Sequence, residues 1–387
     1  MSMQLTPEQE NILNGHQGRA IALAMKSLVT YGESFGADRL VQIKSAHLAG
    51  SFGALPYSAY YKILDQCIND GLQVKVPTTI NPRPGHNYGF INHIAFAKQN
   101  QLDRKMKKLG VTLNYSCVCY EKDNIPAFGD CLAWAESSAV QFANSVLGAR
   151  TNRNSVLIDL CSAITGFTPK FGYLLDENRR GRVLVKLKIN NMDSAALGFI
   201  IGRTVVNKVP VIEHYNFTRT ELKNMGGAMA AAGGMAMFHV EGLTPEAPDM
   251  KTAFTGNPPE STLTITQDDL ENLQTQKPQQ AELVVFGCPQ MTYGEAIDLA
   301  GHFKKKRSKK NIWFCMIPEA KLRFEQTDLY RNIRKNGVKV FSHCPLSALT
   351  VQISRKKVLT PSGKLFYYLK GAEYSSLDEC IKTCREM

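Results

Sequence analysis

The chain of 387 residues has no apolar run that is long enough to cross a membrane as a helix. Its first residues, MSMQLTPEQEN, lack the charged and then apolar pattern of a secretory signal peptide, so we expect a cytoplasmic protein. The ten cysteines form no CxxC pair, and a cytoplasmic chain is not expected to use them as a disulfide framework. They are therefore expected to be buried thiols or metal ligands.

Nucleic-acid motifs are also absent, although the formal net charge is +12. The densest basic run, residues 304–310, has no aromatic platform beside it. We interpret this run as a solvated helix end and the loop that follows, and keep nucleic-acid binding as an alternative. The glycines of Met225–Met229 have the wrong spacing for a dinucleotide fingerprint, and no strand leads straight into them. They are expected to pack tightly in a helix.

Strand-like and helix-like segments alternate along the chain, which predicts an α/β fold with parallel strands. In the first part we expect, in order, a strand at 40–43, a helix at 57–70, a strand from 74, a helix at 91–109 and a strand at 111–115. The proline-rich segment 242–262 predicts a linker. It would join a first α/β lobe, residues 1–241, to a second α/β lobe, residues 263–387.

A helix of small residues is predicted from Cys131 to Leu147. Its polar members are too many for a purely apolar core: Glu136, Ser137, Ser138, Gln141 and Asn144. Buried polar groups need hydrogen-bond partners, so we interpret this helix as one wall of a buried polar site. Arg150 and Arg153 follow it and suit a carboxylate or a phosphate.

Two further polar clusters lie at predicted strand ends, where open α/β sheets place their ligands. His47 stands in the first cluster, as a site residue or as a hydrogen-bonded structural histidine. The second cluster carries Thr78, Thr79 and Asn81 between two prolines, which fix the loop. It is expected to be a binding wall or a rigid turn.

Three cysteines, Cys117, Cys288 and Cys344, each lie just past a short apolar strand. Parallel strands end on one side of a layer, so these thiols from the two lobes are able to converge in a cleft between them. Three converging thiolates form an iron–sulfur or a zinc site. The remaining cysteines fall within predicted helices or strands and are expected to be core thiols, with Cys119 as a fourth candidate ligand.

Several segments occur together with these cysteines: AWAESSAVQFANSVLGARTNR at 133–153, KVPTTINP at 75–82 and FGCP at 286–289. This combination resembles the aconitase X family over essentially the whole chain. The resemblance implies a hydro-lyase (dehydratase) with an aconitase-like fold of several α/β layers around a central cleft. It also implies a large catalytic subunit that acts on a small hydroxy acid, with a separate small swivelling subunit as its partner in a heterodimer. The expected substrate is mevalonate 5-phosphate, and cis-3-hydroxy-L-proline is the alternative.

The resemblance also implies roles for individual residues. Cys117, Cys288 and Cys344 match the ligands of an iron–sulfur cluster. Lys364 and Ser137 are the catalytic candidates, with a residue of the partner subunit as an alternative base. The candidates for substrate binding are His47, Thr78, Thr79, Asn81, Ser138, Asn144, Arg150, Asn152 and Arg153.

Three positions depart from the family pattern. Cys119 replaces a proline, Ser342-His343 replaces an Asp-Thr pair, and Pro361 replaces an asparagine. These departures leave a degenerate, cluster-free homologue open. A further class is a cluster-bearing or degenerate homologue that acts as a binding module for nucleic acid or protein, with residues 304–310 as the nucleic-acid contact.

Overall fold

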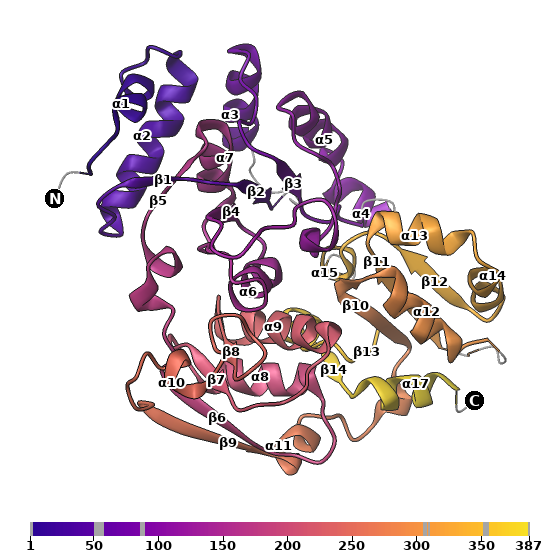
Figure 1. The fold of residues 1–387 in the computed structure, drawn as a ribbon. Coiled ribbons are helices and arrows are strands. Elements are labelled where there is room, and N and C mark those ends of the chain that lie inside the picture. The colour runs from indigo at the N-terminus through magenta and orange to yellow at the C-terminus, as the bar shows by residue number, and fades with distance from the viewer. Residues whose placement is uncertain are drawn as a thin grey trace.

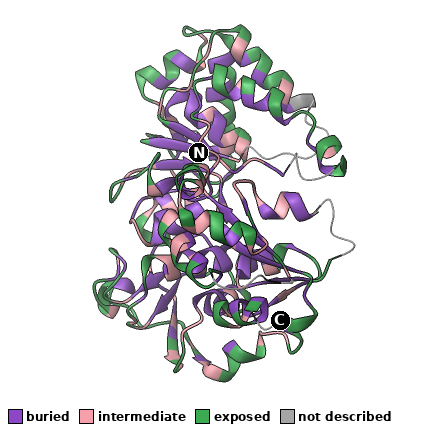
Figure 2. Ribbon diagram, turned by 90° about the vertical axis from the view of Figure 1, so that its right-hand side faces the viewer, coloured by how far each residue is buried: buried purple, intermediate pink, exposed green. Residues whose placement is uncertain are grey.

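The computed structural model describes residues 3–49, 58–85, 90–304, 308, 310–350 and 356–385 (Figure 1). Three sheets of parallel strands and their covering helices form most of this part of the chain. The predicted mixed α/β fold with several parallel layers is therefore confirmed. Figure 2 shows the buried residues gathered along the strands and the helix faces that cover them. None of the described helices is long and apolar enough to cross a membrane.

The first sheet has the order β3-β2-β4, with β2 at Ser45–Leu48, β3 at Thr78–Ile80 and β4 at Leu132–Trp134. Beside it, β1 (Leu40–Gln42) pairs antiparallel with β5 (Phe167–Pro169). The helices of this region are α1 (Pro7–Leu13), α2 (Arg19–Ser34), α3 (Ser58–Asn69), α4 (Phe90–Ala95), α5 (Gln99–Lys108), α6 (Ser137–Ser145) and α7 (Val156–Thr165). A capping box starts α1, because Thr6 and Gln9 bond each other's backbone.

The second sheet has the order β8-β7-β6-β9. Its strands are β6 (Val183–Lys188), β7 (Pro210–Ile212), β8 (His239–Val240) and β9 (Ser261–Thr266). The helices of this region are α8 (Ser194–Thr204), α9 (Arg219–Gly233), α10 (Met250–Ala253) and α11 (Gln267–Asn272). Pairing along six residues joins β6 to β9, so this sheet contains residues from both sides of the segment 242–262. The division into two lobes at that segment stays a prediction.

The third sheet has the order β12-β11-β10-β13-β14. Its strands are β10 (Leu283–Met291), β11 (Asn311–Met316), β12 (Val338–Phe341), β13 (Val358–Thr360) and β14 (Ala372–Tyr374). The helices are α12 (Tyr293–Gly301), α13 (Pro318–Glu325), α14 (Asp328–Lys335), α15 (Pro345–Thr350), α16 (Gly363–Tyr368) and α17 (Leu377–Arg385). Most of the basic run, residues 305–307 and 309, lies outside the described residues.

Helix α9 lies where the three regions meet, between α6 and α8 in Figure 1. Glycines allow this packing: a Cβ at Gly198 of α8 would lie 2.2 Å from the carbonyl oxygen of Met225. A Cβ at Gly363 of α16 would lie 2.7 Å from the Cβ of Ala228. The small residues of α9 are therefore core packing, as expected, and they bring α6 and α16 onto one helix.

Some predicted elements differ from the structure. Residues 131–147 are not one helix, because Leu132–Trp134 form β4 and pair with β2 before α6 begins. Glu136 separates the two elements, with an extended backbone and a side chain that caps α6. The expected helix 91–109 is divided into α4 and α5. Of the expected strand 111–115, only Thr112 forms a bridge, to Thr79.

Candidate active site

A buried ion pair joins α6 to α16. Lys364 Nζ contacts Glu136 Oε1, although the two residues are 228 positions apart, and it also donates to Ser138 Oγ at 3.1 Å. The second carboxylate oxygen of Glu136 accepts from Ser138 Oγ at 2.7 Å and from the Ala139 N–H at 2.6 Å. The side chains of Lys364 and Glu136 are only 9% and 6% exposed. Glu136 serves at once as a helix cap and as the partner of the lysine.

Both members of this pair are charged at neutral pH. Burial alone would lower the pKa of Lys364, but Glu136 and the nearby thiols raise it above its ordinary value. Burial alone would raise the pKa of Glu136, but the charge of Lys364 and the hydrogen bonds hold it below its ordinary value. A buried charge pair costs desolvation free energy that apolar residues would not cost. A protein that keeps such a pair often uses it at a functional site.

Cys117 and Cys288 are buried and Cys344 is half-buried, and the first two interact electrostatically with Lys364, Glu136 and Cys344. Burial, together with Glu136 and Cys344, raises the pKa of the Cys117 thiol to about 12, against the opposing effects of Lys364 and the Gln290 N–H. Burial likewise raises the pKa of the Cys288 thiol, against the opposing charge of Lys364, with Cys344 and Cys117 adding to the rise. The pKa values of these two thiols therefore depend on the same neighbouring groups, Lys364, Glu136 and Cys344.

The described residues contain no three His, Cys, Asp or Glu side chains that are spaced to hold a metal ion. The donor chemistry nevertheless fits an iron–sulfur cluster, whose usual protein ligands are cysteine thiolates. Cys117 Sγ also accepts the backbone N–H of Gln290 at 3.2 Å, the kind of hydrogen bond that tunes clusters. The ligand roles of Cys117, Cys288 and Cys344 stay predictions.

A second polar network surrounds His47, which is fully buried in β2. Its Nδ1 lies 2.8 Å from Thr79 Oγ1 and its Nε2 lies 2.9 Å from Asn81 Oδ1. Burial lowers the pKa of His47 to about 4, against the effects of Glu136 and Asn81, so the ring is neutral at pH 7. Because Asn81 Oδ1 only accepts, Nε2 carries the proton and Nδ1 accepts from the Thr79 hydroxyl. Asn124 Nδ2 in turn donates to Thr79 Oγ1 at 3.0 Å.

Three of the other predicted binding residues have side chains bonded to the backbone. Thr78 Oγ1 donates to the Val76 carbonyl at 2.8 Å. Asn144 Nδ2 donates to the carbonyls of Thr151 and Ala236, both at 2.9 Å, and its Oδ1 accepts the Thr151 N–H. Asn152 bonds the backbone at Phe171 and Tyr173. Hydrogen bonds from these three side chains go mainly to backbone groups, so they stabilise the fold; their roles in substrate binding stay predictions.

The two predicted arginine clamps contact other groups than the ion pair. Arg150 pairs with the exposed Asp176, and Arg153 is exposed and donates to the Ala230 carbonyl at 3.2 Å. Ser137 is half-buried at the start of α6, next to the Ser138 that does contact Lys364.

Sequence reasoning missed two residues of the site, Glu136 and Gln290. Glu136 was counted as a polar member of a helix and given no role. A signal was present, since the carboxylate follows the apolar Leu132–Trp134 and precedes the first helical residue. Gln290 directly follows Cys288-Pro289 within the buried strand β10, where a long polar side chain needs partners.

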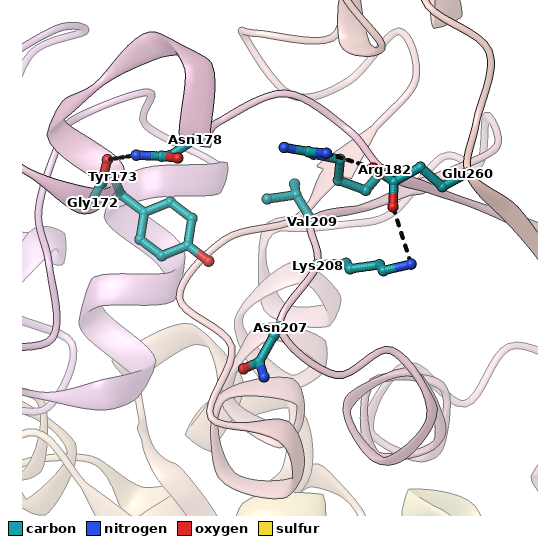
Figure 3. Close-up of a pocket in the computed structure, with 8 residues that line it drawn as sticks. All are labelled: Gly172, Tyr173, Asn178, Arg182, Asn207, Lys208, Val209 and Glu260. Carbon is teal, nitrogen blue, oxygen red and sulfur yellow. Dashed lines mark hydrogen bonds and ion pairs between the residues drawn. The ribbon is translucent and has the colours of Figure 1, made fainter.

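A separate pocket of about 450 Å³ opens at the second sheet (Figure 3). Its cations are already paired: Glu260 lies between Arg182 and Lys208, 3.0 Å from the lysine. Gly172, Tyr173, Asn178, Asn207 and Val209 complete the lining. None of the predicted site residues lines this pocket.

Fold and site together define a multi-layer α/β protein of the aconitase type. The chain belongs to the aconitase X family. Models of the first, second and third aconitase X domains match residues 2–177, 181–275 and 281–386. The prediction of a hydro-lyase of this family is thereby confirmed.

Curated relatives match over nearly the whole chain. A phosphomevalonate dehydratase large subunit from Thermococcus kodakarensis is 38% identical, and the match covers 99% of this chain and 100% of the relative. The protein of that name from Methanosarcina mazei is 34% identical over 98% and 96%. A cis-3-hydroxy-L-proline dehydratase from Pseudomonas aeruginosa is 28% identical over 96% of this chain and 68% of the relative. A crystal structure of Thermococcus kodakaraensis aconitase X in its holo-form matches with a TM-score of 0.86 and 32% identity, covering 98% and 99% of the two chains.

Proposed function

We propose that this chain is the catalytic large subunit of a dehydratase that acts on mevalonate 5-phosphate, with an iron–sulfur cluster held by Cys117, Cys288 and Cys344. The observation that carries the proposal is the buried Lys364–Glu136 pair with these thiols around it. Relatives named for this activity support the substrate, since the two described above are matched over 96% and 100% of their own length. Their name, large subunit, supports a separate small subunit as the partner, and we place the protein in the cytoplasm.

Dehydration removes a hydroxyl group from one carbon and a proton from its neighbour. The cluster, when bound, would supply an open iron that polarises the leaving hydroxyl. Lys364 stays protonated beside Glu136, so it is suited to bind a substrate anion or to stabilise negative charge at the departing oxygen. This role differs from the base that the sequence predicts at Lys364. Ser138 donates to the Glu136 carboxylate at 2.7 Å and accepts from Lys364, so these two residues are placed to take up and relay the proton lost from carbon.

The neutral network of His47, Thr79 and Asn81 would complete one side of the site. His47 lies in β2, next to β4, and its carbonyl accepts the N–H of Ala135 at 3.0 Å. The histidine thus fixes the backbone directly before Glu136. In this proposal the network orients Glu136 through the backbone at Ala135. Because the His47 ring is neutral, it adds no second positive charge that would compete with Lys364 for the Glu136 carboxylate.

The test begins with the chain purified without oxygen. We expect stoichiometric iron and sulfide with broad visible absorption, and turnover of mevalonate 5-phosphate once the small subunit is added. Cys288→Ser should abolish the cluster, whereas Cys315→Ser, which changes a fully buried core thiol of β11, should keep it. Equal iron content in the two variants would contradict the ligand assignment. Turnover of cis-3-hydroxy-L-proline alone would replace the substrate and leave the reaction class intact.

A further inference from the structure

The side chain of Gln290 joins the three segments that carry the site cysteines. Its Oε1 accepts the backbone N–H of Cys117 at 3.1 Å. Its Nε2 lies 3.1 Å from the Ser342 carbonyl, 3.1 Å from the Met316 carbonyl and 3.4 Å from the Tyr115 carbonyl. One amide therefore bonds three segments: the backbone at Tyr115 and Cys117, the end of β11 at Met316, and the loop after β12 at Ser342.

Gln290 and its partner Ser342 are each two residues away from a site cysteine along the chain. Gln290 lies two residues after Cys288 in β10, and Ser342 lies two residues before Cys344. Cys117 is held at two atoms, because the backbone N–H of Gln290 donates to its Sγ at 3.2 Å. Gln290 is 1% exposed, so no bulk water is at hand to replace a lost bond. A change in this side chain is expected to loosen all three cysteine segments at once.

The backbone of Gln290 has an anchor of its own. Lys223 of α9 donates to the Gln290 carbonyl at 3.2 Å and forms an ion pair with Glu295. Removal of the amide alone leaves this anchor in place. The variant is therefore expected to fold while the cysteine segments lose their common tie.

We propose that Gln290 is a positioning residue that brings Cys117, Cys288 and Cys344 into register for one metal centre. This inference rests on the proposed function for the identity of the centre, but the approach of the three thiols is open to measurement without the cluster. Partners that orient metal ligands typically change metal affinity by about 10–100-fold when they are removed.

The experiment is an anaerobic titration of the reduced, cluster-free chain with Co²⁺, followed by sulfur-to-cobalt charge-transfer absorption. Gln290→Met should weaken cobalt binding about 10–100-fold. The matched control is Asn336→Leu, which also removes an amide bonded to two carbonyls, those of Phe303 and Lys304, but away from the cysteines. It should bind cobalt as the wild type does, and Cys288→Ser should lose the charge-transfer band. If the methionine variant does not fold, Gln290→Glu takes its place in the titration. It keeps the shape of the side chain and the acceptor for the Cys117 N–H but removes the Nε2 donor, so it should also weaken cobalt binding.

Wild-type cobalt affinity in both Gln290 variants would overturn the inference, as would an equal loss in Asn336→Leu. A wild-type chain that binds cobalt through thiolates but takes up no iron–sulfur cluster would leave Gln290 in its role and remove the proposed function. A wild-type chain without thiolate–cobalt absorption would overturn both.

Discussion

Two clusters of buried polar side chains in this molecule differ in what they bond. Around Asn144, the partners are mainly backbone groups: Arg179, 2% exposed, donates to the carbonyls of Asn144, Ala149 and Tyr173 and pairs with Glu246. Around Lys364, side chains bond side chains, namely Glu136 and Ser138. The first cluster has its hydrogen-bonding capacity used by the fold. The second cluster holds a charged group and a hydroxyl that bond only side chains among the contacts described above, and these are the groups that we propose engage the substrate.

The largest effect is expected at the Lys364–Glu136 pair. Lys364→Met leaves Glu136 buried without its cation, which should cost about 3–5 kcal/mol of unfolding free energy. Turnover should fall by at least ~100-fold, the lower range for the loss of one donor that stabilises developing charge. Urea unfolding and a turnover assay with the small subunit measure the two losses.

The matched control for this variant is Arg179→Met, which breaks a buried ion pair, with Glu246, in the backbone-bonded cluster. Its loss of stability should be similar, while turnover per folded molecule should change far less. Similar turnover losses in both variants would mean that Lys364 acts only through stability.

A smaller effect is expected in the backbone-bonded cluster. Asn144→Ala leaves the buried N–H of Thr151 and two carbonyls without the amide, at a cost of about 1–3 kcal/mol for each unsatisfied group. The unfolding free energy should therefore drop, with KM unchanged for the folded fraction. A raised KM at unchanged stability would show instead that Asn144 binds substrate, as the sequence predicts.

The histidine network gives a pH-dependent effect. The pKa of His47 is about 4 in the fold and about 6.5 in an unfolded chain, so the unfolded state binds the extra proton between these values. Its contribution to stability is complete above pH 6.5 and is lost as the pH falls toward 4, by up to about 1.4 kcal/mol per pH unit. His47→Gln should remove this part of the slope in urea unfolding between pH 7 and pH 5. An unchanged slope in that variant would contradict the buried, neutral state.

The smallest effect is expected at the pocket of Figure 3. Arg182 and Lys208 pair with Glu260 in solvent, and such pairs contribute little to stability. Arg182→Gln should leave both the urea midpoint and turnover within experimental error. A loss of turnover would bring this pocket into the function and weaken the contrast between the two buried clusters.

The fold class could be predicted from the sequence because strands and helices alternate, and the family from motifs spread over the whole chain. The partner of Lys364 could not, because no local pattern links residues 136 and 364, which meet only when α6 and α16 pack on α9. The same limit applies to Asn144. Its polarity predicts hydrogen-bond partners, but only the structure shows that its amide is bonded to Thr151 and Ala236.

The boundary of β4 shows a local limit. Small residues favour a helix from Cys131 onward by propensity, but Leu132–Trp134 gain more by pairing with β2 in a buried sheet. Tertiary pairing therefore decided against the helix for three residues, and the carboxylate of Glu136 became a cap.

The long separation between Glu136 and Lys364 also sets an order of events during synthesis. A nascent chain leaves the ribosome from its N-terminus, and its domains generally fold as they emerge. Cys117 and Glu136 are therefore synthesised well before Cys288, Cys344 and Lys364. Until then Glu136 has no Lys364 to pair with, and Cys117 has neither of the other two candidate ligands beside it. The proposed site can therefore form only after nearly the whole chain has been synthesised.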